Sequence, residues 1–471
     1  MIRRRAIAAS SGRFPSKACL RFPCLGCRAS LRQFRPSPRR GPARIRALSW
    51  PISDWTAPRS TGCSGKASSP GPECRFPETD PILPCYRTFY SRMNMEKTNS
   101  PAGVLSGVRV LDFSTLLPGP YATQLLLEAG AEVMKIERVD GGDELRSAEQ
   151  RFGRSSLNFA LLNGGKRSIA VNLKDEAERA RLLPLLKDAD ILVEQFRPGV
   201  MDRLGLGYEK LKSINPRLIY CSITGYGQDG PLSHVAGHDL TYMAETGLLS
   251  LTKGADGAPA LPPVLVGDIG GGTLPAVINM LLALRRRDQT GEGCHIDVSI
   301  TDNLMAFPYN ATASGVGFGK WPQPGQERLT GGTPRYQIYR ASDGKYLAAA
   351  PLEQRFWKVF CETIGLDEAW RDDKQDPAAT RQAVAARIAA HSSDFWRDAF
   401  DGKDACTVVV RSIEEAAAHS HFLARGLLDR TISADGLTVP LPRAPLASPF
   451  LRAVPDQAPP ELGEANDLLP A

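Results

Sequence analysis

From residue 107 onward, apolar positions come in short runs whose spacing alternates between that of strands and that of helices. Residues 107–113 form a β-rich run, a Pro/Gly turn follows at 117–121, and residues 122–129 have helical spacing. Gly130 stands where helices commonly end, because glycine adopts the left-handed backbone conformation of that position. A second β-rich run follows at 132–137. This succession of strand, helix and strand predicts a parallel α/β sheet.

The same alternation continues along the chain, so the sheet is predicted to have further strands. Strands are expected at residues 168–172, 191–194 and 218–223, and helices at 176–186 and 208–214. The longest apolar run, at 274–284, ends in three arginines and is shorter than the roughly 18 residues of a membrane-spanning helix. We therefore expect a core helix there and no membrane partner. The pattern predicts a large α/β domain over residues 103–314.

The pattern changes after this domain. Residues 315–335 are rich in Gly, Pro and polar residues, and we interpret them as a linker. Two β-rich segments then flank Asp343-Gly344, a pair typical of tight hairpin turns, and two helical stretches follow. These features predict a small α+β domain over residues 336–431. The Pro-rich residues 432–471 are expected to return across the large domain.

The first 92 residues differ in composition from the rest. They contain 18 Lys and Arg but only 4 Asp and Glu, whereas the remainder contains 40 basic and 47 acidic residues. The net charge of +7 therefore becomes −7 without them, and the body gives no electrostatic support for nucleic-acid binding. Because the segment shows no sustained periodicity, we interpret it as a disordered extension or a mis-assigned start, with Met93 or Met95 as the initiator.

Two other interpretations of this extension stay open. Its many arginines and serines and its few acids fit a targeting peptide. Cys19, Cys24 and Cys27 suggest a metal module, although no His lies near them. The four cysteines beyond residue 92 are widely spaced, and we expect them to be free thiols in a reducing cytosol. The body is thus expected to be cytoplasmic.

Common cofactor motifs are missing from the sequence. The first turn lacks G-x-G-x-x-G, which argues against a dinucleotide, and no P-loop, zincin or G-x-S-x-G motif occurs. We therefore expect neither a metal nor a resident cofactor.

Four segments of the large domain stand out together. They are residues 196–207 (FRPGVMDRLGLG), 224–231 (TGYGQDGP), 236–242 (AGHDLTY) and 266–272 (VGDIGGG). In this order they resemble the signature blocks of the family III CoA-transferase superfamily. The resemblance implies an acyl-CoA substrate and a Rossmann-like large domain with a parallel sheet, joined to a small domain. It also implies a homodimer whose two chains interlock.

Two chemistries occur in that superfamily. Transferases use an aspartate as a nucleophile, and its position matches Asp268. The α-methylacyl-CoA racemases keep this aspartate as an acid/base. They add a histidine thirty residues upstream, which matches His238, and a glutamate that supports it, which matches Glu353. Because all three residues are present, the chain resembles the racemases within the superfamily.

The chemistry of inversion suits these residue types. Inverting a centre next to a thioester carbonyl removes a proton from one face and returns one to the other, so each face needs a base. A histidine titrates near neutrality, and a desolvated carboxylate has its pKa raised toward the same range. His238 and Asp268 are the predicted pair, Asp239 is a further catalytic candidate, and Glu353 would orient the imidazole. The three acids also fit structural roles as helix caps or turn residues.

Binding of CoA needs cations for its phosphates. By resemblance, Arg138 and Arg203 contact the nucleotide end and Lys166 lies in the same region. Each of these also fits a solvated surface position. Tyr242 lines the acyl pocket or belongs to the core. The chain departs from the family at Gly164, where Arg is common.

The sequence therefore predicts racemisation of 2-methylacyl-CoA thioesters by His238 and Asp268. One alternative is transfer of CoA between an acyl-CoA and a free carboxylic acid, with Asp268 as the nucleophile. A second is an acyl-CoA-binding pseudoenzyme. Branched fatty acyl, bile-acid-type and small carboxylic acyl groups are all compatible with the sequence.

Overall fold

The computed structural model describes residues 103–470 except 255 and 453–456. The expectations for residues 1–92, for Met93 and for Met95 lie outside the described residues.

Within the described residues, six strands form one parallel sheet in the order β5-β2-β1-β6-β7-β8. The strands are β1 (Arg109–Asp112), β2 (Glu132–Glu137), β5 (Arg167–Ala170), β6 (Ile191–Glu194), β7 (Ile219–Thr224) and β8 (Cys294–Ser299). The chain runs outward from β1 to β5 on one side and from β6 to β8 on the other. This doubly wound, Rossmann-like order confirms the predicted α/β fold. In such sheets, ligands bind at the carboxyl ends of the strands where the order reverses, here between β1 and β6.

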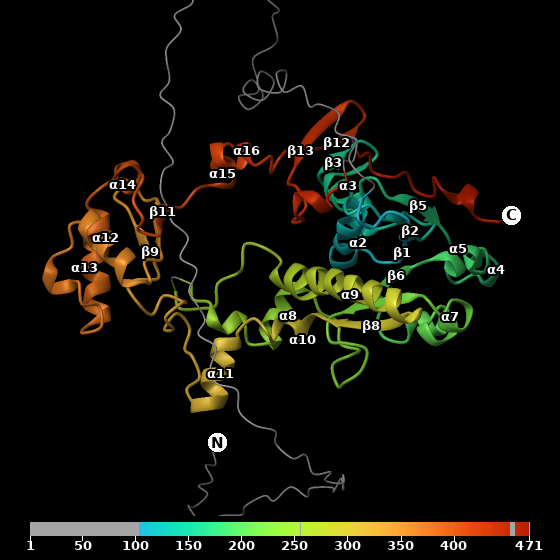
Figure 1. Ribbon diagram of the computed structural model, residues 1–471, viewed down its shortest axis with the longest axis horizontal. Helices are drawn as coiled ribbons and strands as arrows, with labels where there is room; N and C mark the ends of the chain where they lie inside the picture. Colours follow the sequence, from blue (N-terminus) through green and yellow to red (C-terminus); the bar gives the residue numbers. More distant parts are fainter. Residues whose placement is uncertain (1–102, 255, 453–456, 471) are drawn as a thin grey trace, which may run out of the picture. The chain divides into compact units, whose positions relative to one another are not determined.

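Helices cover both faces of the sheet (Figure 1), and the strand period of two sends neighbouring residues to opposite cores. Val110 packs in one core with helices α2 (Pro118–Glu128) and α9 (Leu274–Thr290). Leu111 packs in the other core, with helices α5 (Leu183–Asp188) and α7 (Tyr208–Ile214). Burial on both faces explains why the central strands β6 and β7 are mostly apolar and buried throughout.

The stretch Gly267–Thr290 is long and apolar enough to cross a membrane by length and composition, and half of an 18-residue segment within it is buried. Its helix α9 contacts β7 and β8, with Ala276 and Met280 fully buried, so it is a core helix of this fold. The helix continues through the arginines to Thr290, beyond the predicted end at residue 284. In this continued part Arg287 is buried, and its charge is paired with Asp190 at 2.8 Å.

Two predicted boundaries differ from the structure because of proline. The predicted turn at 117–121 is largely the first turn of α2, where proline fits because that position needs no N–H donor. The single helix predicted at 176–186 is two helices, α4 (Glu176–Ala180) and α5. Pro184 stands at the start of α5 because it cannot continue a preceding helix.

Residues 337–409 form a second unit, in which a small sheet and three helices share their own hydrophobic core. Strands β9 (Gln337–Arg340), β10 (Tyr346–Ala349) and β11 (Thr407–Val409) pair antiparallel in the order β11-β10-β9. Helices α12 (Gln354–Thr363), α13 (Pro377–Ala389) and α14 (Ser393–Phe400) accompany this sheet. Trp357, Phe360 and Trp396 are buried in the shared core. The predicted hairpin is present, whereas α14 and β11 were not expected.

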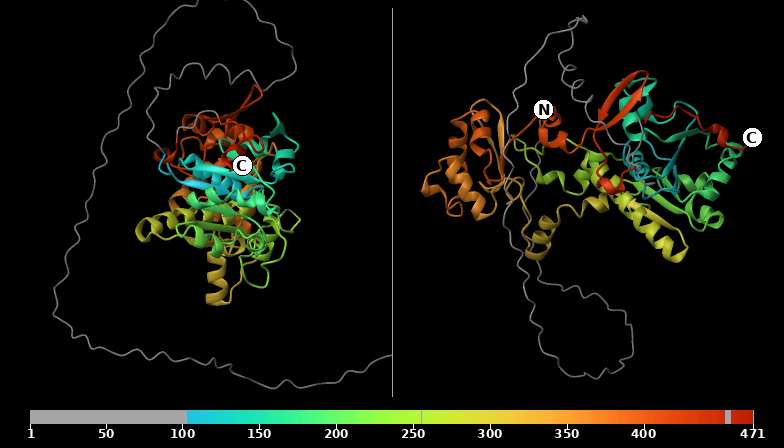
Figure 2. Two further views of the ribbon diagram at one scale, coloured as in Figure 1. Left: turned by 90° about the vertical axis from the view of Figure 1, so that its right-hand side faces the viewer. Right: turned by 45° about the horizontal axis from the view of Figure 1, so that its top comes forward.

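Two further segments connect and close the fold. Helix α11 (Tyr309–Phe318) extends into residues interpreted as linker and ends at Gly319, whose φ is 66°. Beyond α15 (Ile413–Ala417) and α16 (Ser420–Ala424), strands β12 (Arg430–Ala434) and β13 (Leu437–Leu441) form a hairpin. Ile432 of this hairpin packs with Phe152 of β3 (Arg151–Phe152), and Figures 1 and 2 show the red hairpin beside α3 (Leu157–Asn163).

Candidate active site

His238 stands immediately before helix α8 (Asp239–Glu245) and is exposed. Residues 231–238 form turns and irregular chain. Thr241 holds the main chain of His238, because its hydroxyl accepts from the His238 N–H at 2.9 Å and donates to the His238 C=O at 2.7 Å. The imidazole therefore projects from the start of a helix, at a position that a bound substrate can reach.

Asp268 lies in the π-helix η4 (Gly267–Thr273), which continues directly into α9. Such turns are rare and often occur at functional sites. Burial raises the pKa of Asp268 to about 6, the charge of Asp239 adds to this rise, and His238 opposes it. The structure thus brings His238 and Asp268 close enough to interact electrostatically, as a two-base arrangement requires.

Asp239 connects the two candidate bases. It directly follows His238, it is 6% exposed, and its Oδ1 accepts from the Asp268 N–H at 2.9 Å. Gly267 permits this approach, since a Cβ at that position would lie 3.0 Å from Asp239 Oδ1. Asp239 therefore ties down the main chain of the π-helix and also places a negative charge beside Asp268.

The glycines after Asp268 lock the π-helix into the fold. A Cβ on Gly271 would lie 2.8 Å from the C=O of Ile300, the first residue of α10 (Ile300–Leu304). Thr273 donates its hydroxyl to the C=O of Pro118 at 2.9 Å. The position of Asp268 is therefore fixed by α10 on one side and by the start of α2 on the other.

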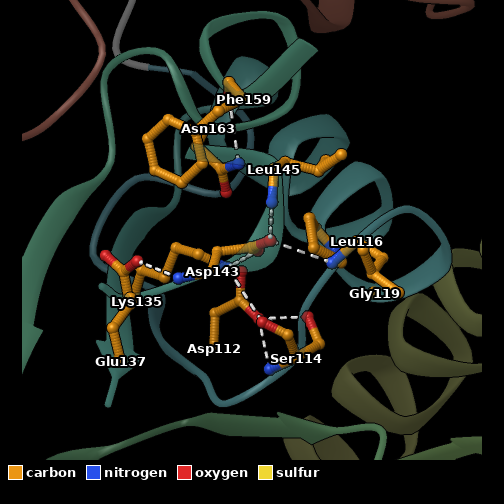
Figure 3. A network of polar contacts seen from close by, with 12 residues as sticks. Asp112, Ser114, Leu116, Gly119, Lys135, Glu137, Asp143, Leu145, Phe159 and Asn163 are labelled. Carbon is orange, nitrogen blue, oxygen red and sulfur yellow. Dashed lines mark hydrogen bonds and ion pairs between the residues drawn. The ribbon is translucent and has the colours of Figure 1, made fainter. Parts of the chain in front are cut away.

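The loop between β1 and α2 leads to Pro118, which packs against the Asp268 helix, although nothing in its sequence signalled this. Leu116 has φ 63°, a left-handed conformation that costs about 1–2 kcal/mol for a residue other than glycine. Asp143 Oδ1 accepts from the Leu116 N–H at 3.3 Å. Lys135 pairs with Asp143 at 3.0 Å and donates to the Ser114 C=O at 2.8 Å (Figure 3). Such strain is typical of active sites, and Pro118 carries this loop up to the Asp268 helix.

Lys166 is buried in the core, which corrects the prediction that it contacts CoA. Its Nζ pairs with Asp112 at 3.0 Å and donates to the Pro120 C=O, to Thr123 Oγ1 and to Asn163 Oδ1. An ammonium group has three N–H bonds, so these partners leave no donor for a phosphate. Burial lowers the pKa of Lys166 to about 8, while Asp112 acts against this shift.

Tyr242 is also a core residue, which was one of its two predicted roles. It is 8% exposed, and its hydroxyl donates to the Gly237 C=O at 2.6 Å. Burial and the nearby charge of Asp268 raise its pKa to about 12. Tyr242 therefore supports the loop that carries His238 instead of lining an acyl pocket.

The two predicted arginines are accessible from solvent. Arg138 follows β2 directly, donates from Nε to the Gly142 C=O at 2.7 Å and pairs with Glu144 at 3.4 Å. Arg203 ends α6 (Val200–Arg203), in the segment after β6, and is exposed. Because carboxyl ends of parallel strands meet at one edge, both arginines and the Leu116 loop follow the same edge of the sheet. Their contact with a nucleotide stays a prediction.

Glu353 is not joined to the other site residues. It precedes α12 and is exposed. Burial raises the pKa of the Cys406 thiol, and the negative charge of Glu353 adds to this rise. Within the described residues, no hydrogen bond or ion pair connects Glu353 with His238 or Asp268. The predicted support of the imidazole by Glu353 is therefore not seen within one chain.

An apolar cavity of about 600 Å³ adjoins the Asp268 helix. Its wall includes Met243 of α8, Val266 just before η4, and Phe307, whose ring reaches Gly270. Among the residues that line the cavity, Glu327 is the only charged one, and most others are leucine, proline, alanine or threonine. A wall of this kind suits an apolar ligand group and offers no cation to a carboxylate.

The chain was compared with known families, proteins and structures. Residues 105–466 match the model of CoA-transferase family III. The mouse (Mus musculus) protein named alpha-methylacyl-CoA racemase is 36% identical over 354 residues, which cover 73% of this chain and 87% of that protein. The acetyl-CoA:oxalate CoA-transferase of Acetobacter aceti is also 36% identical, over 72% of this chain and 88% of its own. A crystal structure of a CaiB/BaiF family protein from Brucella suis has a TM-score of 0.66 and 29% identity, covering 78% and 98% of the two chains.

Proposed function

The chain belongs to CoA-transferase family III, and on that premise we propose that it racemises 2-methylacyl-CoA thioesters, using His238 and Asp268 as its two bases. The observation that carries the proposal is the electrostatic contact between an imidazole and a carboxyl group whose pKa is about 6. A carboxyl group with this pKa exchanges a proton near neutrality, which a reversible inversion needs from a base.

The reaction balances with these two groups alone. Ionised Asp268 takes the α-proton from one enantiomer, and the C–H electron pair moves into the thioester carbonyl to form an enolate. Protonated His238 then delivers its own proton to the opposite face, so the C–H bond reforms with inverted configuration. The other enantiomer follows the same path in reverse. The enzyme ends with its proton on the other base and returns to the starting form by exchange with water.

The apolar cavity supports an apolar acyl group. Oxalate, which the name of the Acetobacter aceti transferase specifies, carries a second carboxylate that a cation would have to pair. The cavity beside Asp268 offers no cation from its lining residues and places Glu327 there instead. A branched hydrocarbon chain fits this wall better than a dicarboxylate does, because burying its surface is favourable without a polar partner.

CoA transfer is the second candidate function, because a relative named as a CoA-transferase is as similar as the racemase, at 36% identity. In that reaction Asp268 would attack the thioester carbonyl and expel CoA thiolate. CoA thiolate would then open this anhydride at the aspartyl carbonyl, which releases the donor acid and leaves an aspartyl-CoA thioester. The acceptor carboxylate would attack that thioester and expel CoA thiolate again, forming a second anhydride. CoA thiolate would open this one at the acyl carbonyl, which gives the new acyl-CoA and free Asp268. The two candidates differ in whether the α-proton is lost and in whether Asp268 becomes acylated.

The test is incubation of the protein with each enantiomer of a 2-methylacyl-CoA in heavy water, followed by NMR. Racemisation predicts deuterium at the α-carbon and loss of optical purity without any acceptor acid. Hydroxylamine or borohydride trapping of an Asp268 adduct, with no α-deuterium, would contradict racemisation and support transfer. Binding of the acyl-CoA with neither exchange nor transfer would contradict both and indicate a pseudoenzyme.

Single-base variants sharpen this test. His238→Ala and Asp268→Ala should each abolish racemisation, because one face then lacks its base. Each variant should still exchange the α-proton of one enantiomer, and the two variants should differ in which one. Full turnover by His238→Ala beside an inactive Asp268→Ala would contradict the two-base assignment.

A further inference from the structure

The exact placement of His238 depends on very few contacts. The seven residues that lead to it, 231–237, have neither helix nor strand, and Gly237 directly precedes it. A proton transfer needs the base in line with the α-carbon, and a displacement of about 1 Å costs on the order of a hundredfold in rate. The side chains that tie down this loop therefore matter for the chemistry as well as for the fold.

The first tie is the Thr241 hydroxyl. It accepts from the His238 N–H at 2.9 Å and donates to the His238 C=O at 2.7 Å, so it holds both polar groups of that residue's main chain. The N–H and C=O of one residue fix the orientation of its Cα–Cβ bond. Thr241 thereby restricts the direction in which the imidazole leaves the chain.

The second tie is Tyr242, which holds the preceding residue. Its hydroxyl donates to the Gly237 C=O at 2.6 Å. Its ring lies against both Gly225 and Gly237, where an added Cβ would come within 2.4 Å of Cε1. Tyr226 packs edge-on against the same ring, with centroids 5.5 Å apart. This close packing restricts the position of the Tyr242 hydroxyl, and the hydrogen bond in turn restricts the Gly237 carbonyl.

The same helical turn also holds the other base, because Asp239 accepts from the Asp268 N–H at 2.9 Å. We propose that Thr241 and Tyr242 are positioning residues that hold His238 opposite Asp268, so that the first turn of α8 sets the spacing of both bases. This inference rests on the proposed racemisation. It assigns Thr241 and Tyr242 no contact with substrate and no proton to transfer.

The test compares Thr241→Val with Thr241→Ser. Valine has the shape of threonine without the hydroxyl, whereas serine keeps the hydroxyl and loses only a methyl group. Deuterium incorporation from heavy water is measured separately on each enantiomer of a 2-methylacyl-CoA. Thr241→Val should slow exchange at least about tenfold on the enantiomer that His238 deprotonates. Exchange on the enantiomer that Asp268 deprotonates should stay close to wild type, and Thr241→Ser should restore both.

Tyr242→Phe is the second variant, because it keeps the buried ring and removes only the hydroxyl that holds Gly237. It should slow exchange on the same enantiomer as Thr241→Val does. A merely structural role would lower both exchange rates together with the thermal unfolding midpoint. If the variants fold and exchange slows equally on both enantiomers, or on neither, the positioning role is refuted. The proposed racemisation would not be affected by that result. Absence of exchange in the wild type would refute racemisation, and the positioning role with it.

Discussion

Asp268 has a pKa of about 6 because it is half-buried beside Asp239, and this value decides when the residue can act as a base. Burial and a neighbouring negative charge both disfavour the ionised carboxylate. An ordinary aspartate stays ionised down to about pH 4. We therefore expect exchange on the enantiomer that Asp268 deprotonates to decline as the pH falls through 6. The pH dependence of kcat/KM should give the pKa of Asp268 in the free enzyme.

Asp239→Asn tests the contribution of the neighbouring charge. Asparagine keeps an oxygen that accepts from the Asp268 N–H, and it removes the negative charge. The pKa of Asp268 should fall, but remain above the ordinary value because burial is the larger cause. At pH 5 about a tenth of wild-type Asp268 is ionised, so the variant should be faster there on the Asp268-dependent enantiomer. An unchanged acid limb in the pH–rate profile would contradict this assignment.

Lys166 shows which part of the site the sequence could not reveal. The motif around it suggested a CoA contact, but a motif does not state whether a cation points outward or into the core. In the structure Lys166 neutralises Asp112, a fully buried carboxylate at the end of β1. Although burial raises the pKa of Asp112, the charges of Lys166 and Lys135 outweigh it and hold that pKa below its usual range. By contrast, His238, Asp239 and Asp268, which the motifs predicted as site residues, lie together in the structure, and their catalytic roles stay predictions.

Lys166→Met should therefore lower the free energy of unfolding of the protein. It should have no specific effect on the affinity for CoA. Removing one partner of a buried ion pair leaves the other charge unpaired, at a cost of about 3–5 kcal/mol. Denaturant unfolding should show this loss in the free protein. Exposed Lys187→Met is the control, and its free energy of unfolding should change by about 0.5 kcal/mol or less. A stable Lys166→Met protein with weakened CoA binding would restore the predicted contact.

At the scale of elements, the π-helix that carries Asp268 was not predicted. Three consecutive glycines usually indicate a turn, because glycine has low helix propensity. Here the glycines are needed for tight packing, which the sequence alone does not display. Strand β8 was missed for a related reason: it is an edge strand with alternating exposed residues, so its apolar signal is weak. The central strands were predicted closely because both of their faces are buried.

Gly271→Ala tests the packing of the π-helix. The new Cβ would lie 2.8 Å from the Ile300 C=O, so η4 or α10 has to move. Overpacking of this kind costs about 1–3 kcal/mol, and the shift of Asp268 should lower exchange on its enantiomer more than on the other. Gly317→Ala in α11 is the matched control, because a Cβ there meets nothing within 4 Å. The control should be neutral or slightly more stable, since alanine favours helix. Equal effects of the two substitutions would contradict this account.

At the scale of the whole molecule, two features in the described part of the chain point to a contact beyond a single chain. Glu353 resembles the glutamate that supports the racemase histidine, but it contacts neither His238 nor Asp268 in the described part of the chain. Helix α11 leaves Tyr309, Val316 and Phe318 between 73% and 79% exposed. Exposed apolar surface on this scale is typical of an interface. We propose that both features reflect the homodimer that the family resemblance implies, in which Glu353 would support His238 of the partner subunit.

A mixed dimer provides the decisive experiment. Glu353→Gln and His238→Ala proteins should each be nearly inactive as homodimers. After the chains are exchanged, one site of a mixed dimer is complete. Its His238 comes from the Glu353→Gln chain, and its Glu353 comes from the His238→Ala chain. The other site of that dimer lacks both. Random exchange should therefore restore about a quarter of wild-type activity.

The control for this experiment mixes His238→Ala with Asp268→Ala. Because His238 and Asp268 interact within one chain, each site of that mixed dimer lacks one base. Racemisation should then stay absent, although chain exchange proceeds as before and can be followed by mass spectrometry of the native dimers. Recovery in the first mixture and not in the second would assign Glu353 to the opposite subunit from the two bases. If neither mixture recovers while exchange is complete, Glu353 acts within its own chain or not at all, and the exposed face of α11 needs another partner.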